Sequence, residues 1–236
     1  MADDPAGEAV THVLLDLDGT ISDSLHSISS SLRAAFELVG VADPGDEAML
    51  TLVGPPFELG LPRIGLTPEQ VTSVIGAYRE RYELGGLFET TMYPGVMEML
   101  DDLAEMGMTL AIATAKPEET AVRIVEHFAI TERFATTVGA TFELDGPGAR
   151  RTKAAVIAET LLRLGIDESS RRRVVMVGDR DHDVEGAIAN GIECLGAGWG
   201  YGGADELLGS GAVEVCASPH DVVVAIAARA KVRSTG

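Results

Sequence analysis

The alternation of short apolar runs with longer stretches of helical spacing constrains the fold of this chain more than any other feature. The first apolar run, at residues 13–17, leads into a helical pattern, and similar runs at 109–113, 134–138 and 174–177 are separated by further helical patterns. Shorter apolar runs follow at 194–195 and 213–215. Strands that alternate with helices are typical of a parallel sheet covered by helices on both faces. We therefore expect an α/β fold with a doubly wound, mostly parallel, Rossmann-like sheet.

The helical stretches carry start and stop signals. Apolar spacing of the helical type predicts helices at residues 24–39, 94–106, 117–128, 152–164, 181–190 and 219–230. Gly107, Gly165 and Gly191 directly follow the expected ends of three of these helices. Glycine is the usual residue just beyond a helix end, because it adopts the left-handed backbone conformation without steric cost. These glycines support the predicted boundaries.

The stretch at residues 40–91 has a different character, with several prolines and only helix-like spacing. Within it, Thr67 followed by Pro68 and by Gln70 is a good helix start, with threonine as N-cap and glutamine three residues later. We predict a small helical domain at residues 22–90, inserted after the first strand of a core domain formed by residues 1–21 and 91–236.

The charge of the chain limits its partners. Acidic residues number 37 and basic residues 18, so the formal net charge is -19. Nucleic-acid polymers and anionic membranes bind surfaces with clustered lysine and arginine, so neither is an expected partner. The charge is consistent with a soluble protein, which we expect to be a monomer or a dimer.

Nothing in the sequence predicts secretion or membrane insertion. The first eight residues are acidic and polar, unlike the basic and apolar start of a signal peptide. No apolar stretch reaches the roughly 18 residues that span a bilayer. Cys194 and Cys216 are far apart and form neither a metal motif nor a disulfide framework, so we expect two free thiols. We expect a cytoplasmic protein.

Acidic residues gather at the end of the first strand. Asp16 and Asp18 are separated by Leu17, and Gly19 and Thr20 follow. Side chains two residues apart in an extended segment point to the same side, so the two carboxylates face one space. Carboxylates this close repel each other unless a cation or a shared proton lies between them.

The ends of two other strands carry matching chemistry. Thr114, Ala115 and Lys116 follow the second strand, where a hydroxyl and the N–H groups of a helix start can bind an anion. Asp179, Asp181 and Asp183 follow the strand at 174–177. Three carboxylates within five residues are costly without a metal ion, and oxygen ligands favour Mg²⁺.

Lys153 lies in the first turn of a predicted helix, where the helix dipole disfavours a cation. An anionic group nearby would account for this placement. Because ligands of parallel sheets bind beyond the carboxyl ends of the strands, all of these side chains are expected in one site. Transfer of a phosphoryl group to a carboxylate needs a nucleophile, charge neutralisation and an acid for the leaving group, and each residue type is present.

These motifs resemble the haloacid-dehalogenase-like phosphatases in order, spacing and strand context over almost the entire chain. The resemblance rests on Asp16-Leu17-Asp18-Gly19-Thr20, Thr114, Lys153 and Gly178-Asp179 with Asp183. The inserted helical domain is placed like the first-position cap of that family. Shorter stretches resemble its phosphoglycolate-phosphatase-like and 5′-nucleotidase-like branch: Val53-Gly54-Pro55-Pro56, Tyr93-Pro94-Gly95, 113–117 and Gly198-Trp199-Gly200-Tyr201-Gly202.

The resemblance implies a role for each motif residue. Asp16 would be the nucleophile and a metal ligand. Asp18 would protonate the leaving oxygen, activate the water and bind the metal through its carbonyl. Thr114 and Lys153 would stabilise the phosphoryl group, which Gly19, Thr20, Ala115 and Lys116 would help to bind. Asp179 would be the metal ligand supplied by the later strand, with Asp183 supporting it.

Several of these residues have simpler interpretations. An aspartate pair followed by glycine also opens a calcium-binding loop, but the twelfth position of that loop would be Ser27 instead of glutamate. Lys116 could lie along the surface of a helix start, and Arg150 and Arg151 compete with Lys153 for its role. Asp181 and His182 are interpreted as ordinary surface residues of a helix.

The predicted function is Mg²⁺-dependent hydrolysis of a small phosphorylated metabolite through an aspartyl phosphate, of the 5′-nucleotidase or phosphoglycolate phosphatase type. One alternative is a phosphotransferase that passes the phosphoryl group to a sugar or protein hydroxyl. The other is a non-enzymatic regulatory binding protein. Asp16, Asp18, Asp179 and Lys153 are all present, which weighs against the second alternative.

Overall fold

The computed structural model describes residues 9–54, 57–141 and 148–230. Pro55 and Pro56, which contribute to one of the family-like stretches, lie outside the described residues. The chain divides into two compact units. One unit joins Met1–Ile21 to Tyr93–Gly236, and the other is Ser22–Met92.

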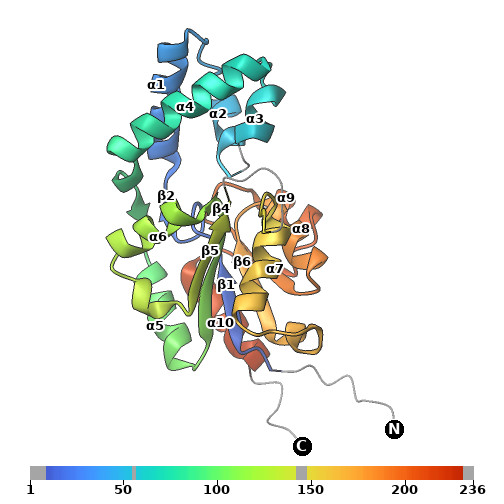
Figure 1. Ribbon diagram of the computed structural model, residues 1–236. Helices are drawn as coiled ribbons and strands as arrows, with labels where there is room; N and C mark the ends of the chain where they lie inside the picture. The colour runs from blue at the N-terminus through green and yellow to red at the C-terminus, as the bar shows by residue number, and fades with distance from the viewer. Residues whose placement is uncertain (1–8, 55–56, 142–147, 231–236) are drawn as a thin grey trace, which may run out of the picture. The chain divides into compact units, whose positions relative to one another are not determined.

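The larger unit is built on a six-stranded sheet in which each pair of neighbouring strands is parallel (Figure 1). Its spatial order is β5-β4-β1-β6-β7-β8. The strands are β1 (His12–Leu15), β4 (Thr109–Pro117), β5 (Thr136–Ala140), β6 (Val174–Gly178), β7 (Glu193–Ala197) and β8 (Glu214–Cys216). The predicted α/β fold with a parallel sheet is confirmed, and the first strand lies between β4 and β6.

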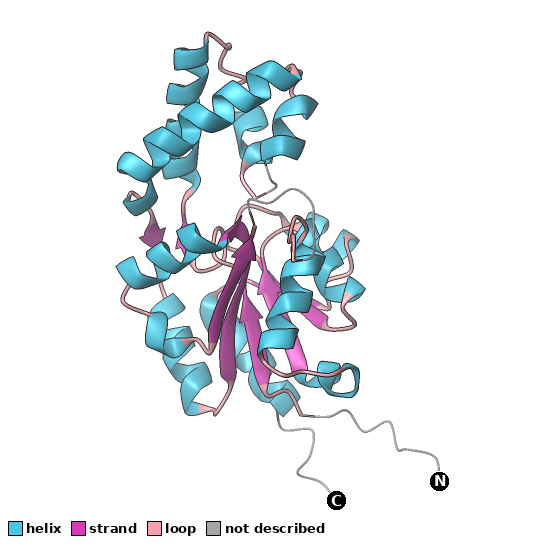
Figure 2. Cartoon of the chain, in the orientation of Figure 1, coloured by secondary structure: helices cyan, strands magenta, loops and turns pink. Residues whose placement is uncertain are grey.

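Helices follow most of these strands (Figure 2). They are α5 (Val96–Glu105), α6 (Glu118–His127), α7 (Lys153–Arg163), α8 (Asp181–Ala189), α9 (Ala204–Gly209) and α10 (Pro219–Ala230), with short 3-10 turns at Thr131–Arg133 and Glu168–Arg173. Helix α7 packs against α8, β4 and β5, whereas α10 packs against α5. The view of Figure 1 shows α7 in front of the sheet and α10 behind it.

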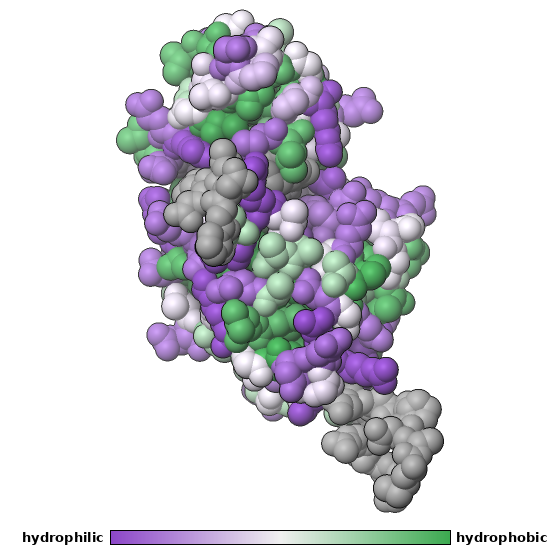
Figure 3. Space-filling view, turned by 45° about the vertical axis from the view of Figure 1, so that its right-hand side comes forward, coloured by the Kyte–Doolittle hydropathy of each residue, from purple (hydrophilic) through white to green (hydrophobic). Residues whose placement is uncertain are grey.

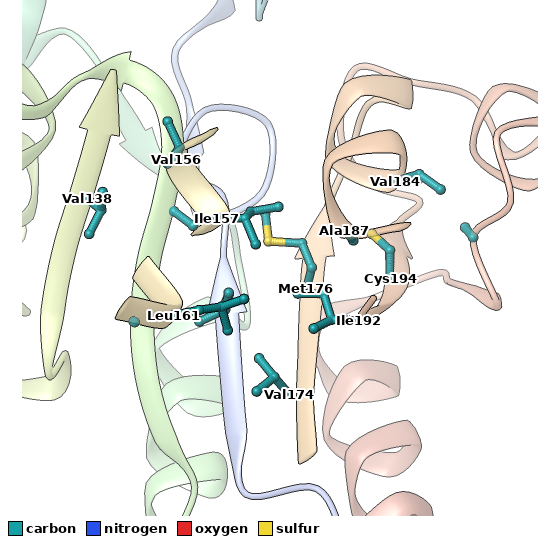
Figure 4. Packing of buried hydrophobic residues seen from close by; sticks show 14 of the residues in the cluster. Val138, Val156, Ile157, Leu161, Val174, Met176, Val184, Ala187, Ile192 and Cys194 are labelled. Carbon is teal, nitrogen blue, oxygen red and sulfur yellow. The ribbon is translucent and has the colours of Figure 1, made fainter. Parts of the chain in front are cut away.

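The core of the larger unit lies between the central strands and helices α7 and α8 (Figure 4). Leu14 of β1 and Met176 of β6 are fully buried against the apolar face of α7. The buried residues of α7 recur at helical spacing: Lys153, Val156, Ile157, Thr160 and Leu161. Lys153 therefore begins the stripe that anchors α7 to the sheet, and core packing fixes where its side chain starts.

The boundaries of the elements differ from the sequence prediction at several points. Strand β1 ends at Leu15, and the buried Leu17 belongs to the following turn, where its carbonyl accepts the N–H of Ile21 at 2.9 Å. Strand β4 continues to Pro117 instead of ending at residue 113, since its polar last residues resembled a loop. The glycine stops are confirmed, with φ of 75° at Gly107, 69° at Gly165 and 70° at Gly191.

The smaller unit is mostly helical, with one short antiparallel pair of strands. Its elements are β2 (Ser22–Asp23), α1 (Leu25–Val39), α2 (Asp46–Leu52), α3 (Phe57–Arg63), α4 (Pro68–Leu84), a 3-10 turn at Gly86–Phe88 and β3 (Thr91–Met92). The predicted helix start at Thr67 is confirmed as a capping box: the Gln70 side chain accepts the Thr67 N–H at 2.9 Å, and Thr67 Oγ1 accepts the Gln70 N–H at 3.3 Å. Helices α1 and α4 pack against each other.

The surface is consistent with the charged composition. Hydrophilic residues spread over much of the face shown in Figure 3, and hydrophobic residues gather in smaller areas. Among the described residues, no helix combines the length and apolar character that a membrane crossing requires.

Candidate active site

The turn after β1 carries the first two aspartates. The Asp16 N–H donates to the Val177 carbonyl at 2.9 Å, so the backbone stays paired to β6 at this residue. Gly19 has a φ of 85°, in the left-handed region. A methyl group on Gly19 would overlap with the carboxylate of Asp179. Glycine is therefore required here twice, for the backbone conformation and for the close approach of Asp179.

Lys153 lies at the centre of a buried ionic array. Its Nζ is 2.8 Å from Asp16 Oδ1 and 2.6 Å from Asp183 Oδ1, and it donates to the Ala113 carbonyl at 3.0 Å. Burial lowers the pKa of Lys153, but the charges of Asp16 and Asp183 outweigh it and raise the pKa above its ordinary value. The amine is therefore a permanent cation, and the sequence expectation of an anion beside Lys153 is met by two carboxylates.

Asp183 holds this array to the start of α8. Its Oδ2 accepts the N–H groups of Asp179 at 3.0 Å and of Arg180 at 3.1 Å. Burial alone would raise the pKa of Asp183, but Lys153 and the hydrogen-bond donors lower it. The side chain is fully buried and has partners on both oxygens, so Asp183 is an ionised support for Lys153 and for the backbone of Asp179.

Asp179 differs from the other two buried aspartates. Its Oδ2 accepts the Tyr201 N–H at 2.8 Å and its Oδ1 accepts the Thr20 hydroxyl at 3.4 Å. Across the described ranges, no lysine, arginine or histidine side chain forms an ion pair with it. Burial raises the pKa of Asp179 well above its usual range, and the charges of Asp183 and Asp16 raise it further. The carboxylate needs a cation to stay ionised.

The donor set fits one divalent cation. Lys153 pairs with two of the three buried carboxylates, Asp16 and Asp183, whereas Asp179 forms no ion pair within the described residues. Burial also raises the pKa of Asp16, although Lys153 opposes this, and a bound cation would favour the ionised form. Ligand atoms of Asp16, His182 and Asp183 lie within 4.8 Å of one another. A group with carboxylate oxygens of this kind can hold a divalent cation.

His182 is more than a surface residue, and that interpretation of the sequence is wrong. Its Nε2 is buried, lies 3.9 Å from Asp183 Oδ1 and has no hydrogen-bond partner in the described part of the chain. Asp181 does face solvent, with half of its side chain exposed. The hydrogen bond from His182 lowers the pKa of Asp181 to about 2. The sequence did offer one signal for His182: it lies in the first turn of α8, three residues after Asp179.

The end of β4 contributes a second lysine. Lys116 Nζ donates to Asp18 Oδ2 at 2.6 Å, and the Lys116 N–H donates to the Thr114 hydroxyl at 3.2 Å. Thr114 is almost fully buried within the strand. The pairing of β4 with β5 is irregular between Ala113 and Pro117, which re-aims this segment. Ala115 lies in the same irregular stretch, and no side-chain interaction assigns it a role.

The competing basic residue Arg150 is engaged elsewhere. Its Nη2 donates to Glu118 Oε2 at 2.6 Å, and its Nε donates to the Gly139 carbonyl at 2.8 Å. The structure thus brings Asp16, Lys153, Asp183, Asp179 and Thr20 into one connected cluster, and it joins Asp18 to Lys116 beside it.

Sequence reasoning assigned no site role to the loop after β7. The Trp199 indole N–H donates to the Thr20 carbonyl at 3.0 Å, and the Tyr201 N–H holds Asp179. Neither contact can be predicted from the sequence. The Tyr201 contact uses a backbone N–H, which every residue except proline has, and the Trp199 contact depends on the geometry of the loop. Only the family-like stretch of alternating glycines pointed to this loop.

Comparison with known proteins agrees with this geometry. The family model described as haloacid dehalogenase-like hydrolase matches residues 13–197. The Tyrosine-protein kinase PtkA of Mycobacterium tuberculosis is 41% identical over 199 residues, which cover 84% of this chain and 66% of that protein. The 5′-nucleotidase of Pseudomonas aeruginosa is 34% identical over 207 residues, covering 87% of this chain and 90% of that protein.

A crystal structure of a predicted phosphatase from Clostridium acetobutylicum superposes with a TM-score of 0.84 at 30% identity, covering 94% of this chain and all of that one. The chain spans 66% of the length of PtkA. The family match covers most of the sheet and the residues of the ionic array. The chain therefore belongs to the haloacid dehalogenase-like hydrolase family.

Proposed function

We propose that the protein is a Mg²⁺-dependent phosphatase that hydrolyses a small phosphorylated metabolite through an aspartyl phosphate on Asp16. The observation that carries the proposal is the buried array in which Lys153 pairs with Asp16 and Asp183 while Asp179 forms no ion pair among the described residues. Phosphoryl transfer to an aspartate requires a carboxylate nucleophile, a fixed cation beside it and a carboxylate that can hold a further cation.

The first step forms the bond between an Asp16 carboxylate oxygen and phosphorus and breaks the bond from phosphorus to the leaving oxygen. Asp18 in its protonated form gives its proton to that oxygen, so the product leaves as an alcohol. In the second step a water molecule attacks phosphorus, Asp18 takes the proton of the water, and Asp16 is released as a carboxylate. Mg²⁺, when bound, supplies positive charge to the phosphoryl oxygens and to Asp16.

The basic side chains compensate for the acidic surface. A chain with a net charge of -19 repels a phosphate ester overall, so binding depends on local positive charge. Lys153 is buried against Asp16, and Lys116 lies against Asp18. The Thr114 hydroxyl and the N–H groups near Gly19 and Thr20 are the proposed neutral donors to the phosphoryl oxygens.

The substrate class follows from the family and from the smaller unit. The similarity to a 5′-nucleotidase over most of both chains supports a nucleoside 5′-monophosphate as the first candidate, with phosphoglycolate as the second. We assign the helical unit Ser22–Met92 the role of a cap that selects the substrate and excludes water.

Phosphotransfer to a protein tyrosine is the second candidate, favoured by the 41% identity to a protein named as a tyrosine kinase. The first step would be the same, since the phosphoryl group would still pass to Asp16. A tyrosine hydroxyl would then replace water as the attacking group. The two functions differ only in the acceptor.

The test is the release of inorganic phosphate from a panel of phosphomonoesters with Mg²⁺ and with a chelator. The panel contains nucleoside 5′-monophosphates, phosphoglycolate, sugar phosphates, pyrophosphate and p-nitrophenyl phosphate. We expect release that requires Mg²⁺ and that is fastest with one class of metabolite. If phosphate appears on a tyrosine-containing acceptor and none is released to water, the result contradicts hydrolysis as the function and supports phosphotransfer.

A further inference from the structure

The loop that joins β7 to α9 surrounds Asp179. We call residues 198–202 the clamp loop, after the sequence Gly198-Trp199-Gly200-Tyr201-Gly202. Its Tyr201 N–H donates to Asp179 Oδ2 at 2.8 Å, and its Gly202 N–H donates to the Asp179 carbonyl at 3.1 Å. The loop therefore holds this residue by its side chain and by its backbone at once.

Gly200 and Gly202 of the clamp loop lie against Asp179, which leaves no room for side chains at these two positions. A methyl group on Gly200 would overlap with the Asp179 side chain at its base and with the Gly19 carbonyl. A methyl group on Gly202 would overlap with the Asp179 carbonyl. The atoms that these methyl groups would meet first are backbone carbonyl oxygens and the Cβ of Asp179. Such atoms cannot rotate away as the end of a long side chain would.

The same loop also holds the turn that follows the nucleophile. The indole N–H of Trp199 donates to the Thr20 carbonyl at 3.0 Å, and the hydroxyl of Thr20 donates to Asp179 Oδ1 at 3.4 Å. Both oxygens of the Asp179 carboxylate are thus oriented, one directly by the clamp loop and the other by a residue that the loop fixes. Just beyond the loop, Glu206 accepts the Arg180 Nε at 2.9 Å and the Asp181 N–H at 3.1 Å.

We propose that the clamp loop is a positioning device that orients the Asp179 carboxylate for a divalent cation and thereby sets the affinity of the site for that cation. The inference rests on the proposed role of Asp179 in metal binding, but not on hydrolysis. The physical reason is that a carboxylate fixed by hydrogen bonds loses no rotational freedom when the ion binds. Outer partners of metal ligands typically change metal affinity by about 10–100-fold.

The test measures Mg²⁺ binding by titration calorimetry on the full chain without any substrate, in the wild type, in Gly200→Ala and in Gly203→Ala. Gly203 is the matched control, because it lies one residue beyond the loop and has an ordinary φ of -83°. A methyl group there meets no atom of the described residues within 4 Å, chain neighbours aside. We expect Gly200→Ala to weaken Mg²⁺ binding at least about 10-fold and Gly203→Ala to leave it unchanged.

A second variant keeps the test informative should Gly200→Ala fail to fold. Trp199→Phe keeps an aromatic ring, but this ring is smaller than the indole and lacks the N–H that holds Thr20. We expect weaker Mg²⁺ binding and a higher Mg²⁺ concentration for half-maximal turnover, with kcat recovered at saturating Mg²⁺. A merely structural role would not be rescued by the ion.

Two results separate this inference from the proposed function. Wild-type affinity for Mg²⁺ in Trp199→Phe and in folded Gly200→Ala would overturn the positioning role, whatever the protein does to phosphate esters. A wild type that binds Mg²⁺ through the clamp-dependent site but turns over no phosphate ester would support the inference and contradict the phosphatase proposal.

Discussion

Asp16, Asp179 and Asp183 carry the same side chain in one buried site, yet their partners differ. Asp183 accepts two backbone N–H groups and pairs with Lys153, so its charge is compensated inside the protein. Asp16 shares that lysine and has no other ion-pair partner among the described residues. Asp179 has hydrogen-bond donors only. The surroundings of the three carboxyl groups therefore differ in the way that their proposed roles as support, nucleophile and metal ligand require.

Because no ion pair compensates its charge, Asp179 should lower the stability of the folded protein when no metal ion is bound. Since burial and the neighbouring carboxylates raise its pKa in the folded protein, its charged form opposes folding increasingly as pH rises through that pKa. Asp179→Asn should therefore raise Tm near neutral pH in chelator by at least about 2 °C, as expected for a gain of about 1 kcal/mol. Thermal unfolding with and without Mg²⁺ checks this.

The same variant should lose the stabilisation that Mg²⁺ gives the wild type. A ligand that binds only the folded state stabilises it by about 2.7 kcal/mol at 100 times its dissociation constant. Equal stabilisation of Asp179→Asn and wild type by Mg²⁺ would show that Asp179 is not a ligand of the ion.

Lys153 should be a large contributor to stability as well as to chemistry. Lys153→Met leaves Asp16 and Asp183 without their shared cation in a buried site, and removing one partner of a buried ion pair costs about 3–5 kcal/mol. Urea unfolding measures the loss. Arg151→Met is the matched control on the preceding loop, where a change of within about 0.5 kcal/mol is expected. A loss below about 1 kcal/mol for Lys153→Met would contradict the ionic array.

Among the elements, the start of α6, the end of β5, the segment before α7 and the last residue of α7 meet at Glu118. Glu118, the first residue of α6, accepts the Gly139 N–H at 3.2 Å and hydrogen bonds from Arg150 and Arg163 at 2.6 and 3.0 Å. Lys116 lies two residues before Glu118, and Lys153 lies three residues after Arg150. The junction thus helps to fix the end of β4, which carries Lys116, and the segment before α7, which leads to Lys153.

This junction predicts a pH-dependent contribution from Glu118. Burial raises its pKa, but the hydrogen bonds from Arg163 and Gly139 and the charge of Arg150 lower it overall. A depressed pKa in the folded state stabilises the protein above the ordinary carboxyl pKa, and this stabilisation is lost as pH falls through the depressed value. Glu118→Gln should therefore be less stable than the wild type near neutral pH.

The difference between Glu118→Gln and wild type should shrink as pH falls through the carboxyl range, which urea midpoints measured from neutral to acid pH will show. Glu119→Gln is the control, since Glu119 is the next residue and is exposed. A constant difference at every pH would mean that the charge of Glu118 contributes nothing.

The order of the elements was predictable because apolar runs and helical spacing are properties of the sequence itself. Strand β4 was predicted too short, since Thr114 and Lys116 are polar although they continue the strand. The two-residue strands β2 and β3 and the six-residue helix α9 are too short for any periodicity to show.

The site was predictable where the side chain itself carries the signal. Asp16, Asp179 and Lys153 stand out as charged residues at strand or helix ends, and the rule on strand carboxyl ends joins them. The clamp loop could not be derived in this way, because its donors to Asp179 are backbone N–H groups. His182 was misjudged because its orientation toward Asp183 depends on the turn of α8.

For the whole molecule, two opposite charge patterns coexist. The chain has a net charge of -19, while its site gathers two lysines, each against a strand-end aspartate. We expect these lysines to supply the local positive charge that a phosphate ester needs in a protein with an acidic surface. The compact helical unit Ser22–Met92 is the part of the chain that we expect to set which phosphate ester enters.

The measurement that tests the central claim most directly is mass spectrometry of the Asp16-containing peptide after acid quench of a single turnover. The substrate is the best ester of the panel, with Mg²⁺ present. We predict one phosphoryl group on Asp16, sensitive to hydroxylamine as an acyl phosphate is. Turnover in the wild type with no phosphoryl group on Asp16, together with retained activity in Asp16→Asn, would contradict the account.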